Sequence, residues 1–285
     1  MGDYTVFHTI AWPSTYAYYF FVIGISAALF FFSTLSWFRE EFKVLRRSTF
    51  YGSFAMLALG GILLIADLSQ PLRFLNTINP FYMHFTSPLT WGALLLMSFG
   101  AVSAVYFLAM QKGDEKIGRL LGVVGSLLAL GLPVYTGFDL SVHQHRPIWN
   151  TPLMPVLFVA LSLVSGAAVA SFLAKGDDRL LANLRQIMLW STGAVGVMLF
   201  SLVLTAANGG SASELTLMFM TSGSMGLMFI GVGALLGTIT PIVLLLAPFG
   251  SQRNTVMAAS ALLLVGGMAL RYAILVGPQI VHTYF

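Results

Sequence analysis

Residues 16–38 read YAYYFFVIGISAALFFFSTLSWF, an apolar run without a single charge. A helix needs about 20 such residues to cross the hydrocarbon core of a bilayer, so this run predicts a membrane-spanning helix. The first basic residue of the chain is Arg39. Because a secretory signal peptide opens with a positively charged region, we expect residues 16–38 to remain as a helix of the protein.

The rest of the sequence continues this pattern. Of its 285 residues, 58% are hydrophobic and 8% are charged, whereas about a quarter are charged in soluble domains. Eight apolar runs occur, at 16–38, 48–66, 89–111, 119–138, 152–174, 187–207, 223–247 and 255–277. Backbone polar groups find no water in lipid, which requires helices, and no run alternates like a barrel strand. The sequence therefore predicts an all-α, polytopic transmembrane protein in which residues 1–285 form a single integral membrane domain.

The basic residues indicate how the spans are oriented. Eleven of the 14 lie in or next to four alternate loops, at 39–47, 112–119, 175–185 and 248–254. Positively charged loops stay on the cytoplasmic side, so we expect a cell inner-membrane protein with both termini in the periplasm. Because these residues are spread between apolar runs instead of forming one patch, they do not indicate a nucleic-acid partner.

The opposite, outer side carries the titratable groups that could perform chemistry. These are all five histidines and four carboxylates: His8, His84, His143, His145, His282, Asp3, Asp67, Asp139 and Glu214. Two outer connections, 67–88 and 139–151, are also long, and long ordered loops tend to be functional. At the first of them, Asp67 and Arg73 carry opposite charges that can pair at a membrane edge. They fit either a structural ion pair or part of a redox or proton site.

A second polar group surrounds Tyr135, Asp139 and His143. A quinone head group takes up two electrons and two protons, so its site needs hydrogen-bond donors and titratable groups that lead to water. These three side chains could supply both. If the helix continues, Tyr135 and Asp139 stand four residues apart and share a face. The alternative is an interfacial tyrosine followed by ordinary loop histidines.

Arg271 is the one basic residue well inside an apolar run. An arginine within a membrane span costs about 2.5 to 3.5 kcal/mol on insertion scales, so it usually faces a cavity or a carboxylate. We expect Asp67 or Asp139 to pair with Arg271, in preference to simple snorkelling.

What the sequence lacks excludes several classes of protein. Without cysteine, it can hold neither a disulfide nor a cysteine-ligated iron–sulfur cluster of its own. No histidine falls in the runs for a membrane-buried b haem, and no lysine falls there for a retinal Schiff base. We expect no metal in this protein. The absence of a carboxylate at mid-membrane disfavours a proton pump or an ion-coupled carrier.

Several short motifs follow one another in a characteristic order. They are Asp67-Leu68 with Pro71, Arg73 and Phe74; Ser87-Pro88 with Trp91-Gly92; Tyr135-Thr136-Gly137; Leu140-Ser141; Trp149 with Pro152; and Leu157-Phe158 with Ser165-Gly166. In their order and spacing they resemble the NrfD family, the membrane subunits typified by that of polysulfide reductase. The stretch His143-Gln144-His145-Arg146, with Asp139 before it, is more polar than this family pattern.

The resemblance implies eight helices in two four-helix bundles, without haem, that bind menaquinone or ubiquinone near the outer face. It implies an iron–sulfur subunit docked on that periplasmic side, and a molybdenum or multihaem catalytic subunit beyond it. Tyr135 matches the motif tyrosine that contacts quinone, and His8 is similar in region to a histidine near that quinone.

The sequence therefore leads to one hypothesis and two rivals. The protein is expected to be the quinone-binding anchor subunit of an oxidoreductase, not catalytic alone. The residues that we expect to hold the head group are Tyr135, Asp139, His143, Asp67, Arg73 and His8, with Arg271 joining Asp67 and Asp139 in an ion pair or proton transfer. The rivals are an ion or small-solute transporter and a non-catalytic membrane anchor.

Overall fold

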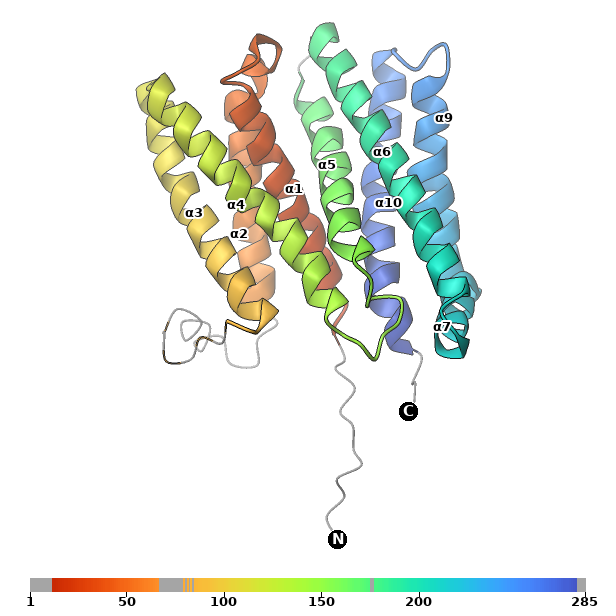
Figure 1. Cartoon of the computed structure of the whole chain (residues 1–285). Helices are drawn as coiled ribbons and strands as arrows, with labels where there is room; N and C mark the ends of the chain where they lie inside the picture. The colour runs from red at the N-terminus through yellow and green to blue at the C-terminus, as the bar shows by residue number, and fades with distance from the viewer. Residues whose placement is uncertain are drawn as a thin grey trace.

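The computed structural model describes residues 12–66, 79, 81, 83, 85–174 and 177–280. Within these ranges the protein is helical, and eight helices are long and apolar enough to cross a membrane (Figure 1). Each of the eight coincides with one of the eight apolar runs. The prediction of an all-α polytopic membrane protein is confirmed.

The helices follow one another with short connections. Their bounds are α1 (Thr15–Leu35), η1 (Glu40–Leu45), α2 (Arg46–Ala66), α3 (Pro88–Lys112), α4 (Glu115–Ser141), α5 (Leu153–Leu173), α6 (Asp178–Ala207), α7 (Ser211–Thr221), α8 (Gly223–Gly226), η3 (Leu227–Ile239), α9 (Thr240–Leu246) and α10 (Arg253–Ile280). The segments α8, η3 and α9 together form the seventh span. The short helix α7 was not predicted, because it is too short to stand out as an apolar run.

Capping residues explain where the sequence bounds differ from the observed ones. The sixth span begins at Asp178 and not near residue 187, because the side chain of Asp177 accepts hydrogen bonds from the backbone N–H groups of Arg179 and Leu180. Such a cap satisfies donors that the first helical turn leaves open. By contrast, α3 begins at Pro88, as the Ser87-Pro88 motif indicates.

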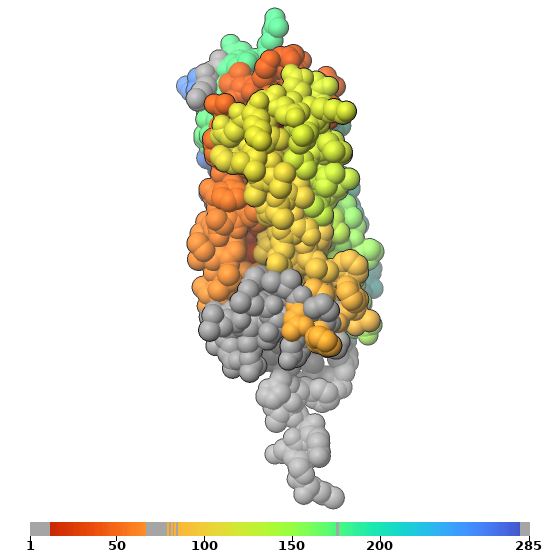
Figure 2. All heavy atoms as spheres, turned by 90° about the vertical axis from the view of Figure 1, so that its left-hand side faces the viewer, coloured from red at the N-terminus to blue at the C-terminus, as the bar shows by residue number. Residues whose placement is uncertain are grey.

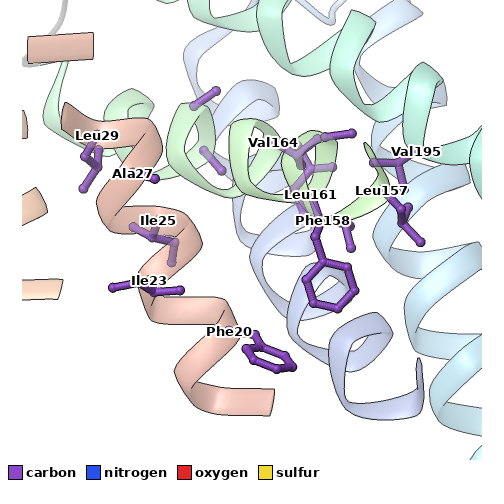
Figure 3. Packing of buried hydrophobic residues seen from close by; sticks show 14 of the residues in the cluster. Phe20, Ile23, Ile25, Ala27, Leu29, Leu157, Phe158, Leu161, Val164 and Val195 are labelled. Atoms are coloured by element: carbon purple, nitrogen blue, oxygen red, sulfur yellow. The ribbon is translucent and has the colours of Figure 1, made fainter. Parts of the chain in front are cut away.

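The helix α1 lies at the centre of the molecule. It packs against α2 and α4 on one side and against α5 and α10 on the other. In the core between α1 and α5 (Figure 3), the rings of Phe20 and Phe158 meet edge to face with centroids 5.6 Å apart. Because α1 contacts helices of both halves, the division into two four-helix bundles stays a prediction.

The outer surface of the helices is apolar. Figure 2 looks onto the face that α2 and α3 form, and these helices expose large side chains such as Leu59, Ile62, Val105 and Leu108. Ile62 keeps 64% of its surface exposed. Apolar side chains pointing outward over the height of the helices are what a lipid solvent requires.

The two ends of the molecule differ in their side chains. The end formed by residues 12–14, 142–152 and 208–210 carries His143 and His145 and is called the histidine end; the other, formed by residues 36–45, 113–114 and 247–252, is called the basic end. The Trp12 N–H donates to Gln279 Oε1 at 2.6 Å, so the two ends of the described sequence meet at the histidine end. That arrangement agrees with an even number of spans.

The seventh span has an unusual geometry. Its residues Leu227–Ile239 are wound as a π-helix, and Thr238 Oγ1 donates to the carbonyl oxygen of Gly233, five residues earlier. On the face toward α10, Gly237 lies against Gly266, and a Cβ at Gly266 would stand 2.1 Å from the Cα atom of Gly237. Glycine at both positions lets the two backbones touch, as small residues do in membrane helix pairs.

We predict that Gly266→Ala lowers stability by about 1 to 3 kcal/mol, because the new methyl group overpacks this backbone contact. The measurement is the thermal unfolding midpoint of the detergent-purified protein. Gly193→Ala is the matched control, because a Cβ at Gly193 meets nothing within 4 Å. Equal midpoints for the two variants would contradict the close approach of η3 and α10.

Candidate functional site

The pair Tyr135 and Asp139 lies near the histidine end of α4. Because α4 continues to Ser141, the two side chains share a face, and the Tyr135 hydroxyl donates to Asp139 Oδ2 at 3.4 Å. Each residue exposes only 8% of its surface. A phenol and a carboxyl group in contact, away from water, form a unit that can donate a hydrogen bond and take up a proton.

His143 connects this pair to the surface. Its Nδ1 lies 2.9 Å from the backbone oxygen of Asp139, which fixes the imidazole at the end of α4. The ring is surrounded by Trp12, Trp149 and His145, with ring centroids 5.6 to 5.7 Å away. Three of the predicted site residues are thus brought together, and we call Tyr135, Asp139 and His143 the Tyr135 cluster.

Two tyrosines of α1 join the cluster, although neither was among the residues predicted from sequence. Tyr19 is buried and interacts electrostatically with Asp139 and with Tyr16. The rings of Tyr16 and Tyr19 stand 6.5 Å apart. Their signal in the sequence was the Tyr-Ala-Tyr-Tyr opening of an otherwise aliphatic and phenylalanine-rich span, where hydroxyl groups need partners.

The helix α3 provides the surface on which Tyr135 rests. A Cβ at Gly92 would lie 2.1 Å from Cζ of the Tyr135 ring, so the ring occupies the space that a side chain would fill. Gly92 belongs to the Trp91-Gly92 motif, which on sequence grounds was a helix start. Its second role, to seat the tyrosine, follows only from the neighbouring helix.

The loop after α4 is held on α10 through a proline. Pro278 has no backbone N–H, so it cannot donate to the carbonyl oxygen of Ile274, four residues earlier in α10. The indole Nε1 of Trp149 donates to that oxygen instead, at 2.6 Å, and Arg146 Nη1 donates to the carbonyl oxygen of Pro278 at 2.5 Å. The loop that carries His143 is therefore fixed by the gap that proline leaves in the helix.

We predict that Trp149→Phe destabilises the protein by about 1 to 3 kcal/mol, because the buried Ile274 carbonyl loses its donor. Thermal unfolding in detergent measures the loss, and limited proteolysis within residues 142–152 reports the loosened loop. The control is Trp190→Phe, since Trp190 is 78% exposed on α6. If both variants unfold at the same temperature, the indole bond does not hold the loop.

The electrostatics of this loop favour a neutral imidazole. The pKa of His145 is lowered, first by partial burial and then by the nearby Arg146 and His143. His145 is therefore neutral at pH 7 and can accept a proton from a neighbouring group.

Arg271 has different partners from those predicted. It is fully buried, and its guanidinium donates to Gly267 O at 3.0 Å, Ser162 Oγ at 3.3 Å and Ser165 Oγ at 3.5 Å. Within the described residues no carboxylate stands within ion-pair distance of it, so the predicted pairing with Asp139 is wrong. The reason is orientation: Arg271 faces the serines of α5, whereas Asp139 faces Tyr135.

The remaining predicted site residues cannot be placed. His8, Asp67 and Arg73 lie outside the described residues, and so do the histidines 84 and 282. Among the residues that are described, no three His, Asp or Glu side chains gather as a metal ion would require.

Comparison with known proteins agrees with this architecture. The sequence model of the family described as "Polysulphide reductase, NrfD" matches residues 4–282. The sequence is 27% identical to the C chain of polysulfide reductase from Wolinella succinogenes, over 98% of this protein and 97% of that relative. It is 30% identical to the C subunit of tetrathionate reductase from Salmonella typhimurium, over 66% of this protein and 56% of that relative.

The match extends to a relative with a different name. Protein NrfD of Escherichia coli is 29% identical, over 58% of this protein and 59% of that relative. The family model covers nearly the whole sequence, including all eight spans and the Tyr135 cluster. This chain is therefore a multi-pass membrane protein that belongs to the polysulphide reductase NrfD family.

Proposed function

We propose that the protein is the quinone-binding membrane subunit of a respiratory oxidoreductase complex, with its quinone site at the Tyr135 cluster. The observation that carries the proposal is the buried contact of Tyr135 with Asp139, one helical turn before His143. A hydrogen-bond donor, a proton acceptor and a surface imidazole stand in sequence from the interior to the histidine end. This is the set of groups that quinone chemistry needs.

Each residue of the cluster has a distinct task. The quinone, menaquinone or ubiquinone, supplies the two-electron, two-proton chemistry when it is bound. The Tyr135 hydroxyl donates a hydrogen bond to a carbonyl oxygen of the head group. Asp139 holds or releases the proton that accompanies electron transfer, and His143 exchanges protons with water at the surface. Tyr19 and Tyr16 form the wall on the α1 side.

The partners follow from the names of the relatives. Polysulfide, tetrathionate and selenate reductases each have a related protein named as one of several lettered components, which supports a place for this protein beside other subunits. We infer an iron–sulfur subunit docked at the histidine end, and a molybdenum or multihaem catalytic subunit attached to it. The protein itself contains no cysteine to ligate a cluster.

The proposal also assigns a side of the membrane. The histidine end would face the periplasm and the basic end the cytoplasm, with both termini periplasmic in the cell inner membrane. Reporter fusions at Phe285 would then be active only with a periplasmic reporter. Activity of a cytoplasmic reporter at that position would reverse the assignment.

The test of the proposal is Tyr135→Phe in the purified complex. We expect quinol-linked turnover to fall about tenfold, since loss of one hydrogen bond worth about 1.4 kcal/mol has that effect on a rate. Activity with an artificial dye that donates directly to the partner subunits should be unchanged. Tyr18→Phe is the control, because Tyr18 lies on the same side of the molecule on α1 but is 48% exposed.

Two results would refute the proposal. Equal quinol turnover in Tyr135→Phe and the native complex would remove Tyr135 from the site. A protein that is active in solute transport when purified alone, without any redox partner, would replace the proposal with the transporter alternative.

A further inference from the structure

A second site lies at the basic end, far from the Tyr135 cluster. There a cleft of about 620 Å³ opens between η1 and α6. Arg39, Glu41 and Phe42 line one wall, and Asn183, Gln186 and Trp190 line the other. Polar and apolar side chains alternate along it. A mixed lining of this kind suits a ligand with both a polar head and an apolar part.

The cleft continues into an apolar groove. The groove, of about 470 Å³, runs between α1, α4 and α5, and the side chains that line it are almost wholly apolar. Leu35 and Leu163 line both spaces, so the cleft and the groove join. Figure 1 shows α4 and α5 diverging toward the basic end, with α1 between them. Each volume falls in the range of about 300 to 1,000 Å³ that is typical of ligand sites.

The length of the groove matches one leaflet of a bilayer. On α4 it extends from Val123 to Pro133, which is about 15 Å of helix rise. The hydrocarbon core of a bilayer is about 30 Å thick, so the groove spans about half of it. An occupant whose head lies in the cleft would therefore have its acyl tail in the leaflet at the basic end.

The charges in the cleft define the head group. Arg39 and Glu41 are both exposed, and in the described part of the sequence neither forms an ion pair, whereas neighbouring Glu40 is paired with Lys43 at 3.4 Å. One positive and one negative side chain in a single cleft complement a head group that carries both charges. A guanidinium binds phosphate well, and a carboxylate binds a primary ammonium group.

We propose that the cleft and the groove together bind one aminophospholipid with a zwitterionic head, such as phosphatidylethanolamine. Arg39 binds its phosphate, Glu41 its ammonium group, and one acyl tail lies along α1 in the groove. Asn183 and Gln186 donate hydrogen bonds to the phosphate or ester oxygens. The lipid is thus an integral part of the packing around α1, the central helix.

Native mass spectrometry of the protein, purified with its accompanying subunits, tests this proposal. The detergent-solubilised protein is exchanged with phosphatidylethanolamine, phosphatidylglycerol or phosphatidylcholine in turn. We expect one phosphatidylethanolamine to stay bound, with about tenfold preference over the other two lipids. Arg39→Gln should lower its retention about tenfold, and Glu41→Gln should abolish the preference over phosphatidylcholine, as each removes one charge-assisted hydrogen bond.

A filled groove provides a second test that leaves the head-group residues intact. Val159 lines the groove on α5, so Val159→Trp should exclude the acyl tail and lower retention of the lipid. Val197→Trp is its control, since Val197 is 67% exposed on α6 and does not line the groove.

Two outcomes would overturn the proposal. Equal retention of all three lipids by the native protein and the Arg39 and Glu41 variants would mean only annular lipid. A retained quinone, displaced by Val159→Trp, would mean that the groove belongs to a second quinone site.

Discussion

Substitution of Asp139 by asparagine is expected to lower quinol-linked turnover about 100-fold, the lower end of what a positioned proton acceptor contributes. Asparagine keeps the size of the side chain and can still accept a hydrogen bond from Tyr135, at 3.4 Å in the native protein. It cannot take up a proton at neutral pH. The loss therefore separates proton transfer from binding, and the quinol KM should change much less than kcat.

The control for this variant is Asp178→Asn. Asp178 is exposed in the first turn of α6, at the basic end. Its quinol turnover should equal that of the native complex, and both variants should keep dye-linked activity and their partner subunits. Full quinol turnover in Asp139→Asn would show that the proton leaves by another group.

The second large effect is expected from Gly92→Ala. The added methyl group would stand 2.1 Å from Cζ of Tyr135, and the ring is buried, so it must move. A displacement of about 1 Å in a positioning element can cost about 100-fold in rate. We expect this loss in quinol-linked turnover, although position 92 bears no functional group.

A matched alanine distinguishes displacement of the ring from general damage to α3. Gly100 lies on the same helix, and a Cβ there meets nothing within 4 Å. Gly100→Ala should therefore leave turnover and thermal stability unchanged. If Gly92→Ala keeps full quinol turnover while it remains folded, the position of the Tyr135 ring does not matter for the reaction.

The spans were predictable because each depends on local composition alone. Residues 16–38, an uncharged run, became α1, and the four-residue spacing of Tyr135 and Asp139 gave their contact once α4 was seen to continue past both. The start of α6 was missed because its first turns are polar. A cap at Asp177 extends that helix beyond its apolar part.

Contacts between helices were less predictable. The sequence indicates how deep Arg271 lies in the membrane but not which helix it faces, and the structure turns it toward Ser162 and Ser165. In the same way, nothing local connects Gly92 with Tyr135, since the two residues lie on different helices. Periodicity describes one helix at a time, and the site is formed where several meet.

Proline at position 278 illustrates a signal that could have been read. Its missing N–H predicts an open carbonyl at Ile274 from the sequence alone. Which donor fills it, the Trp149 indole, depends on the fold of the loop after α4. Local chemistry thus identified the gap, and tertiary structure selected the partner.

The position of the quinone head group is tested most directly by photoaffinity labelling. The purified complex is irradiated with an azidoquinone, and the labelled peptides are mapped by mass spectrometry. We expect the label within residues 134–143 of α4 and its loop, or within residues 15–20 of α1, and we expect excess quinol analogue to suppress it. Label confined to the basic end, around residues 35–42 or 183–190, would contradict a quinone site at the Tyr135 cluster.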